Sequence, residues 1–123
     1  MLPRCDQTLE WPLLQAAFSS SGRGFDLRQA FAHDARRFGH FSQQAPHVFA
    51  DLSKNLWDAD TENLLLALAR SCGLQARRDA MFGGQPINAT EGRAVLHTLL
   101  RRPAGLALPG DDASIARSLN EVH

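Results

Sequence analysis

The chain of 123 residues has only two cysteines, no excess of charge of either sign and no long apolar run. Cys5 and Cys72 lie far apart without the Cys/His spacing of a metal site, so we expect two reduced thiols. Thirteen basic residues balance thirteen acidic ones, which argues against binding to a nucleic-acid backbone. Apolar runs such as residues 64–69 fall far short of the roughly 20 residues that a membrane-spanning helix needs. These absences exclude a disulfide framework, a nucleic-acid partner and a membrane segment from our expectations.

The composition that remains is typical of one globular core. Hydrophobic residues make up 44% of the chain, and the length suits about one domain. Charged residues at Arg4, Asp6 and Glu10 interrupt any apolar stretch that could act as a secretory signal. We therefore expect a soluble, cytoplasmic protein.

Helical periodicity dominates the first third of the sequence. Apolar residues recur at helical spacing from Trp11 to Phe18. Asp26 is expected to cap a second helix, on which Arg36 belongs to the polar face. The apolar face of that helix is predicted to be one continuous stripe that packs inward, made of Leu27, Phe31, Ala35 and Phe38.

The middle of the chain predicts a strand followed by two helices. In residues 47–52, Val48, Ala50 and Leu52 alternate with Phe49, Asp51 and the following Ser53, as in a short strand. Asp58 is the expected N-cap of the next helix, which should end at Gly73. Residues 74–81 then predict a shorter helix that Gly83 and Gly84 terminate in a turn.

The last part of the chain predicts a strand and two more helices. We expect a strand at residues 87–89, and a largely buried helix that Thr90 caps and Pro103 stops. A final helix is expected from Asp111 to Val122.

The predicted helix at residues 90–101 carries the best candidate for binding chemistry. Arg93, His97 and Arg101 are spaced four apart and would share one edge of it. Two guanidiniums beside an imidazole could hold a phosphate or a carboxylate. The alternative is that they pair with acidic side chains or backbone carbonyls between elements, and we favour it because buried charges need partners merely to be tolerated.

Two other groups of residues could be mistaken for chemical sites. Histidines recur every seven residues at His33, His40 and His47, yet no carboxylate or cysteine accompanies them at ligand spacing, so solvated histidines are expected. Lys54 follows the strand, where an exposed lysine is commoner than a desolvated nucleophile.

The double glycine and the tryptophans also have ordinary structural explanations. Gly83 and Gly84 lack the spacing of a Walker or Rossmann loop. Trp11 and Trp57 are expected to anchor packing, since no basic groove accompanies them.

Two segments together match a known pair of motifs. The first is Asp51-Leu52-Ser53-Lys54-Asn55. The second has matching residues at Asp79, Ala80, Met81, Phe82, Gly84, Ile87, Asn88, Thr90, Glu91, Arg93, Ala94, Val95, Leu96, His97, Leu100 and Arg101. In both, the chain resembles the phosphoglucose isomerase family. It departs from the family's usual residues at Leu52, Gly83, Gln85, Pro86 and Leu99.

The resemblance implies that residues 1–123 are the N-terminal helical segment of a longer enzyme. The expected fold is mostly α, with one or two short strands, belonging to a larger α/β enzyme of the sugar-isomerase type. The family interconverts glucose 6-phosphate and fructose 6-phosphate in glycolysis and gluconeogenesis, as a cytoplasmic homodimer without metal or organic cofactor.

The resemblance also implies where the chemistry of the family lies. A glutamate of the family moves the proton between C1 and C2, and the catalytic groups and sugar-phosphate loop lie beyond His123. We therefore expect no catalytic, cofactor-binding or metal-binding residue here, although Glu91 and His97 have suitable chemistry. The segment alone should be inactive.

Two alternatives remain open from the sequence. The chain could be a truncated, non-catalytic helical interaction module, which tight binding to a full-length isomerase without turnover would reveal. It could instead be a gene fragment, which the DNA beyond His123 would reveal. Cut off from the body of the enzyme, the isolated chain is expected to be marginally stable or to self-associate, because the strand around Val48 and the Val95 and Leu99 side of the helix after Thr90 would lose their cover.

Overall fold

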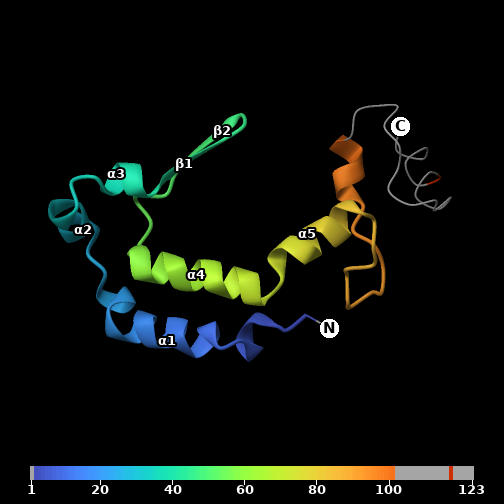
Figure 1. The fold of residues 1–123 in the computed structure, drawn as a ribbon, viewed down its shortest axis with the longest axis horizontal. Coiled ribbons are helices and arrows are strands. Elements are labelled where there is room, and N and C mark those ends of the chain that lie inside the picture. Colours follow the sequence, from blue (N-terminus) through green and yellow to red (C-terminus); the bar gives the residue numbers. More distant parts are fainter. Residues whose placement is uncertain (1, 102–116, 118–123) are drawn as a thin grey trace. The chain divides into compact units, whose positions relative to one another are not determined.

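The computed structural model describes residues 2–101 and Arg117, which form two compact units. Unit 1 extends to Cys72 and unit 2 begins at Gly73 (Figure 1). Unit 1 contains the elements η1 (Cys5–Gln7), α1 (Glu10–Ser20), η2 (Gly22–Gly24), α2 (Leu27–His33), α3 (Arg37–His40), β1 (Ser42–Ala45), β2 (Val48–Asp51) and α4 (Ala59–Ser71), where η marks a 3-10 helix. Unit 2 contains α5 (Leu74–Phe82) and η3 (His97–Arg101). The mostly α fold with a short sheet is confirmed.

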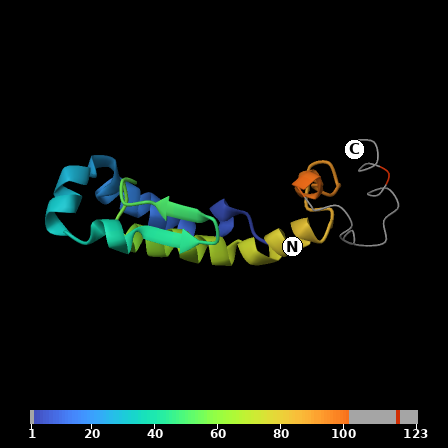
Figure 2. The same cartoon turned by 90° about the horizontal axis from the view of Figure 1, so that it is seen from above.

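Helices α1 and α4 lie side by side in unit 1, as Figures 1 and 2 both show. They run antiparallel, because Ser71 at the end of α4 donates a hydrogen bond of 2.8 Å to Glu10 at the start of α1. The predicted ends of α4 are confirmed. The carboxylate of Asp58 accepts a hydrogen bond of 2.8 Å from the Thr61 backbone N–H, and Gly73 follows the helix with a left-handed φ of 64°.

The second predicted helix is interrupted, so the continuous apolar stripe is wrong. Asp26 caps α2 as expected, accepting hydrogen bonds from the backbone N–H groups of residues 28 and 29. The helix ends before Asp34, whose carboxylate accepts a 2.9 Å hydrogen bond from the Arg36 N–H and so competes with a helical continuation. Phe31 is 37% exposed and Phe38 is 54% exposed, so neither packs inward fully.

Strands β1 and β2 form an antiparallel hairpin with Ser42 opposite Asp51 and Ala45 opposite Val48. The strand predicted at residues 47–52 is confirmed as β2. β1 was not predicted, since Ser-Gln-Gln-Ala shows no alternation of apolar and polar residues. Pro46 and His47 form the turn, and His47 has a positive φ of 64°.

In unit 2 the predicted helix over residues 74–81 is confirmed as α5, and Gly84 turns the chain after it with a φ of 70°. The strand expected at residues 87–89 and the long helix expected after it are wrong. An isolated bridge joins Asn88 to Arg93, and within the described residues up to 101 the next helical region is η3.

Local backbone chemistry explains this difference. The Asn88 side chain accepts 3.2 Å hydrogen bonds from the N–H groups of Thr90 and Glu91, which makes a turn in place of a helix start. Gly92 then adopts a left-handed φ of 63°, which a right-handed helix excludes. The helix expected from Asp111 to Val122 lies outside the described residues, apart from Arg117.

The described residues bury few apolar side chains. Among them only Phe41 and Leu99 are buried, at 4% and 5% exposure. The expected exposure of Val48 is confirmed at 58%, whereas the expected exposure of Leu99 is wrong. No helix among the described residues is both long enough and apolar enough to traverse a bilayer.

Candidate functional site: the Arg37 clamp

The most elaborate polar arrangement in unit 1 centres on Arg37, at the start of α3. Its side chain is buried at 3% exposure, and its guanidinium donates hydrogen bonds to three backbone carbonyls. Nε binds the Ser53 carbonyl at 2.8 Å, while Nη2 binds those of Asn55 at 3.0 Å and Trp57 at 2.7 Å. We call Arg37 and these three carbonyls the Arg37 clamp.

Three aromatic rings surround the same guanidinium. Its carbon lies 4.4 Å from the ring centroid of Phe41, 5.5 Å from that of Phe25 and 5.8 Å from that of Phe31. Contacts within about 6 Å of a ring face attract a cation electrostatically. The buried charge is therefore stabilised by carbonyl dipoles and aromatic rings, an arrangement that suits the planar fork of arginine better than the point charge of lysine.

The segment that the clamp holds is also fixed at its beginning. Asp51 accepts hydrogen bonds from the backbone N–H of Ser53 at 2.9 Å and from its hydroxyl at 2.6 Å. The hydroxyl bond is the main cause that lowers the pKa of Asp51. The Leu52 N–H donates to the Phe41 carbonyl at 2.9 Å. Ser53 is consequently buried at 1% exposure, whereas Lys54 is exposed as predicted.

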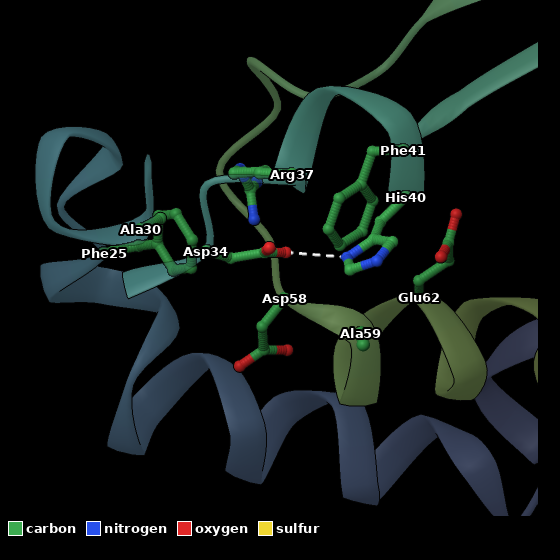
Figure 3. Close-up of a pocket in the computed structure, with 9 residues that line it drawn as sticks. All are labelled: Phe25, Ala30, Asp34, Arg37, His40, Phe41, Asp58, Ala59 and Glu62. Atoms are coloured by element: carbon green, nitrogen blue, oxygen red, sulfur yellow. Dashed lines mark hydrogen bonds and ion pairs between the residues drawn. The ribbon is translucent and has the colours of Figure 1, made fainter. Parts of the chain in front are cut away.

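An open pocket of about 400 Å³ lies beside the clamp (Figure 3). Its lining residues are Phe25, Ala30, Asp34, Arg37, His40, Phe41, Asp58, Ala59 and Glu62. Figure 3 shows that three carboxylates and the His40 ring surround it. His40 Nδ1 lies 2.8 Å from an Asp34 carboxylate oxygen, and this hydrogen bond is the main cause that lowers the pKa of Asp34.

Two acidic side chains of the pocket, Asp34 and Asp58, form hydrogen bonds that stabilise the local fold. Asp58 caps α4, and the hydrogen bond from the Thr61 N–H is the first cause of its lowered pKa. Asp34 accepts a hydrogen bond from the Arg36 N–H, just beyond α2, and also binds His40. Within the described part of the chain, no group of three or more His, Cys, Asp or Glu side chains is arranged to hold a metal ion. These contacts indicate a structural role for Asp34 and Asp58.

The structure does not form the seam predicted from Arg93, His97 and Arg101. All three residues are exposed, because the helix that would align them is absent. Arg93 forms an ion pair with Glu91, which supports the pairing alternative for that residue. The prediction that these three residues share one edge of a helix is therefore wrong.

The histidines predicted to be solvated do not converge. His33, His40 and His47 are all exposed, and they belong to α2, α3 and the hairpin turn. Neither Cys5 nor Cys72 is in a disulfide, in agreement with the expected reduced thiols.

The tryptophans are partly buried. Trp11 lies on α1, and Trp57 belongs to the clamped segment with its indole N–H buried and without a hydrogen-bond partner.

Sequence patterns missed Arg37. Its partners are carbonyls 16 to 20 residues away, and every residue type carries a carbonyl, so no side-chain motif marks them. The signal that was present is the concentration of phenylalanines on either side of it, at Phe25, Phe31 and Phe41.

Comparison with known proteins decides the family. The family model for phosphoglucose isomerase matches residues 51–123, which is more than half of the chain. The chain belongs to the phosphoglucose isomerase family. The match begins at the segment that the Arg37 clamp holds, although Arg37 itself precedes it.

Close relatives within the phosphoglucose isomerase family carry the name glucose-6-phosphate isomerase. The protein of Polaromonas naphthalenivorans is 68% identical over 100 residues, covering 81% of this chain and 19% of the relative. That of Albidiferax ferrireducens is 60% identical over 123 residues, covering 98% of this chain and 24% of the relative. Glucose-6-phosphate isomerase 1 of Pseudomonas putida is 44% identical, covering 91% and 20%. The chain thus spans about a fifth of the curated relatives that it matches.

Proposed function

We propose that residues 1–123 form the N-terminal helical segment of a glucose-6-phosphate isomerase and that this segment supplies structure without catalytic groups. The observation that carries the proposal is the 60% identity to the Albidiferax ferrireducens enzyme across 98% of this chain, which accounts for only 24% of that enzyme. The lack of convergence among Arg93, His97 and Arg101 supports the structural part of the proposal.

The complete enzyme would interconvert glucose 6-phosphate and fructose 6-phosphate in glycolysis and gluconeogenesis. We place it in the cytoplasm as a homodimer that needs no metal or organic cofactor. The substrate would be bound by polypeptide that corresponds to the other four-fifths of the relatives. The names of the relatives support this activity.

The contribution of the segment follows from the Arg37 clamp. By binding the carbonyls of Ser53, Asn55 and Trp57, the clamp fixes the backbone immediately before α4. Asp58, directly after the clamped segment, then caps the helix. The direction of α4 is therefore set by the contacts of Arg37 at the start of α3. The segment thereby supports the rest of the isomerase polypeptide where it packs on unit 1.

A coupled assay of fructose 6-phosphate conversion to glucose 6-phosphate tests the proposal. The matching segment of the Albidiferax ferrireducens enzyme is replaced by residues 1–123 of this chain, and the chimera is compared with the unaltered enzyme and with the isolated chain. We expect activity in the chimera close to that of the unaltered enzyme and none in the isolated chain.

Either of two results would contradict the proposal. A folded but inactive chimera would show that this segment cannot serve the enzyme. Activity of the isolated chain would show that it contains catalytic groups.

A further inference from the structure

The β1–β2 hairpin presents large apolar side chains to solvent. Val48 is 58% exposed and Phe49 is 56% exposed on β2, and Phe38 on α3 is 54% exposed. The rings of Phe38 and Phe49 lie 6.1 Å apart, so these two residues form a continuous surface. We call Phe38, Val48 and Phe49 the hairpin patch.

The hairpin patch covers both faces of β2. Adjacent residues of a strand point to opposite faces, so Val48 and Phe49 lie on different sides of the sheet. Phe38 accompanies Phe49 on one side, and Ala45 is opposite Val48 on the other. A strand with one solvated face normally alternates apolar and polar residues, whereas strands covered on both faces carry consecutive apolar residues. β2 has the pattern of a strand that is covered on both sides.

Nothing among the described elements of unit 1 supplies this cover. The extensive contacts of each strand are with the other strand, and in Figure 1 the hairpin projects away from the paired helices α1 and α4. An isolated two-stranded hairpin is marginally stable in water and needs a further strand or a packed layer. The hairpin is therefore an incomplete structure by itself.

We infer that the hairpin patch is the surface on which this segment docks with the rest of the isomerase polypeptide. The inference rests on the proposed function. Nearly all of this chain aligns with one quarter of the Albidiferax ferrireducens relative. The occupant of the hairpin patch is the polypeptide that corresponds to the remaining three-quarters of that relative. That polypeptide presents apolar side chains to Phe38 and Phe49 on one face of the hairpin and to Val48 on the other.

The active chimera defined above tests this docking surface with a matched pair of variants. Phe49→Thr removes the exposed ring and keeps a residue of high β propensity. Gln43→Thr places the same residue in β1 at an exposed position that is not apolar. The measurements are the thermal midpoint of the chimera and the hydrogen exchange of backbone amides 42–51, in the chimera and in the isolated chain.

We expect the hairpin amides to exchange at least about tenfold more slowly in the chimera than in the isolated chain, because burial suppresses local opening. Phe49→Thr should lower the midpoint of the chimera by about 3 °C or more, since loss of one buried ring is a large change for an enzyme of this size. Gln43→Thr should leave it unchanged within error.

Three results would overturn the inference. Equal exchange in the active chimera and the isolated chain, with equal midpoints for Phe49→Thr and Gln43→Thr, would show that the patch stays in solvent. A second copy of the chain would be the occupant if three results coincided. The hairpin amides would already be protected in the isolated chain, this protection would disappear when a dimer is diluted, and Phe49→Thr would also remove it. An inactive chimera would refute the proposed function on which the inference rests.

Discussion

Replacement of Arg37 by lysine is the most informative perturbation of this fold. The substitution keeps the positive charge, so any loss of stability reports on the planar fork of arginine and not on net charge. Arg37 binds three carbonyls and lies against three phenyl rings. A lysine ammonium is a compact, strongly hydrated charge that cannot reproduce that geometry.

The magnitude follows from the burial of each contact. The hydrogen bond to Ser53 is buried, whereas those to Asn55 and Trp57 are partly buried and open to replacement by water. An unsatisfied buried acceptor costs about 1–3 kcal/mol and a partly hydrated one less. We expect Arg37→Lys to reduce the free energy of unfolding by about 2 kcal/mol, and Arg37→Ala, which also loses the ring contacts, by about 4 kcal/mol.

Urea unfolding of the 123-residue chain, followed by far-ultraviolet circular dichroism and tryptophan fluorescence, measures these changes. Trp57 belongs to the clamped segment and reports on it directly. The control is Arg36→Ala, which removes the exposed neighbouring arginine and should stay within about 0.5 kcal/mol of the parent. If Arg37→Lys unfolds at the same urea concentration as Arg36→Ala, the clamp does not stabilise the fold and the reasoning is refuted.

Three further substitutions test local backbone chemistry in the same unfolding assay. The hydrogen bond from Thr61 holds the pKa of Asp58 below its ordinary value, so the stabilisation by Asp58 is present above the unfolded pKa and is lost as pH falls through the lower folded pKa. Asp58→Asn keeps a capping acceptor without a titrating group, so the acid loss of stability should become shallower; an unchanged slope would contradict this assignment. His47→Gly should stabilise the hairpin by about 0.5 kcal/mol, because φ is 64° there, and a lower urea midpoint would contradict it. Gly73→Ala, also at a φ of 64°, should destabilise the α4 end by about 1 kcal/mol; no change would show that this turn adapts.

Features that depend on adjacent residues were predictable from the sequence. Asp26 and Asp58 cap helices because a carboxylate two or three residues from a free N–H needs no distant partner. Gly73 ends α4 for a similarly local reason, since it adopts a left-handed conformation at little steric cost. The β2 strand was predictable because Val48, Ala50 and Leu52 follow the two-residue period of a strand.

Features that depend on distant or competing partners were not predictable. β1 forms because β2 supplies its hydrogen-bond partners, and its own polar sequence does not indicate a strand. Arg37 binds carbonyls that no residue type marks. The helix predicted after Thr90 had the right apolar periodicity, yet the Asn88 turn and the left-handed Gly92 outweigh it in the structure.

At the candidate site, too, the sequence predicted some features and missed others. The sequence resemblance placed the family correctly, since the family model matches residues 51–123. The preformed seam failed because it required a helix over its whole length. The structure instead directs attention to Arg37, which precedes the matched region and holds the beginning of it.

In this chain, the groups that fix the backbone are buried and polar, whereas several large apolar side chains are exposed. Arg37 and Ser53 are among the most buried described residues, whereas Phe38, Val48 and Phe49 remain more than half exposed. Polar contacts thus fix the path of the backbone in a segment whose described residues bury few apolar side chains. Hydrophobic burial supplies most of the free energy of folding. We therefore expect the Arg37 clamp to specify the backbone geometry of this segment, and the polypeptide that covers the hairpin patch to supply much of its stability.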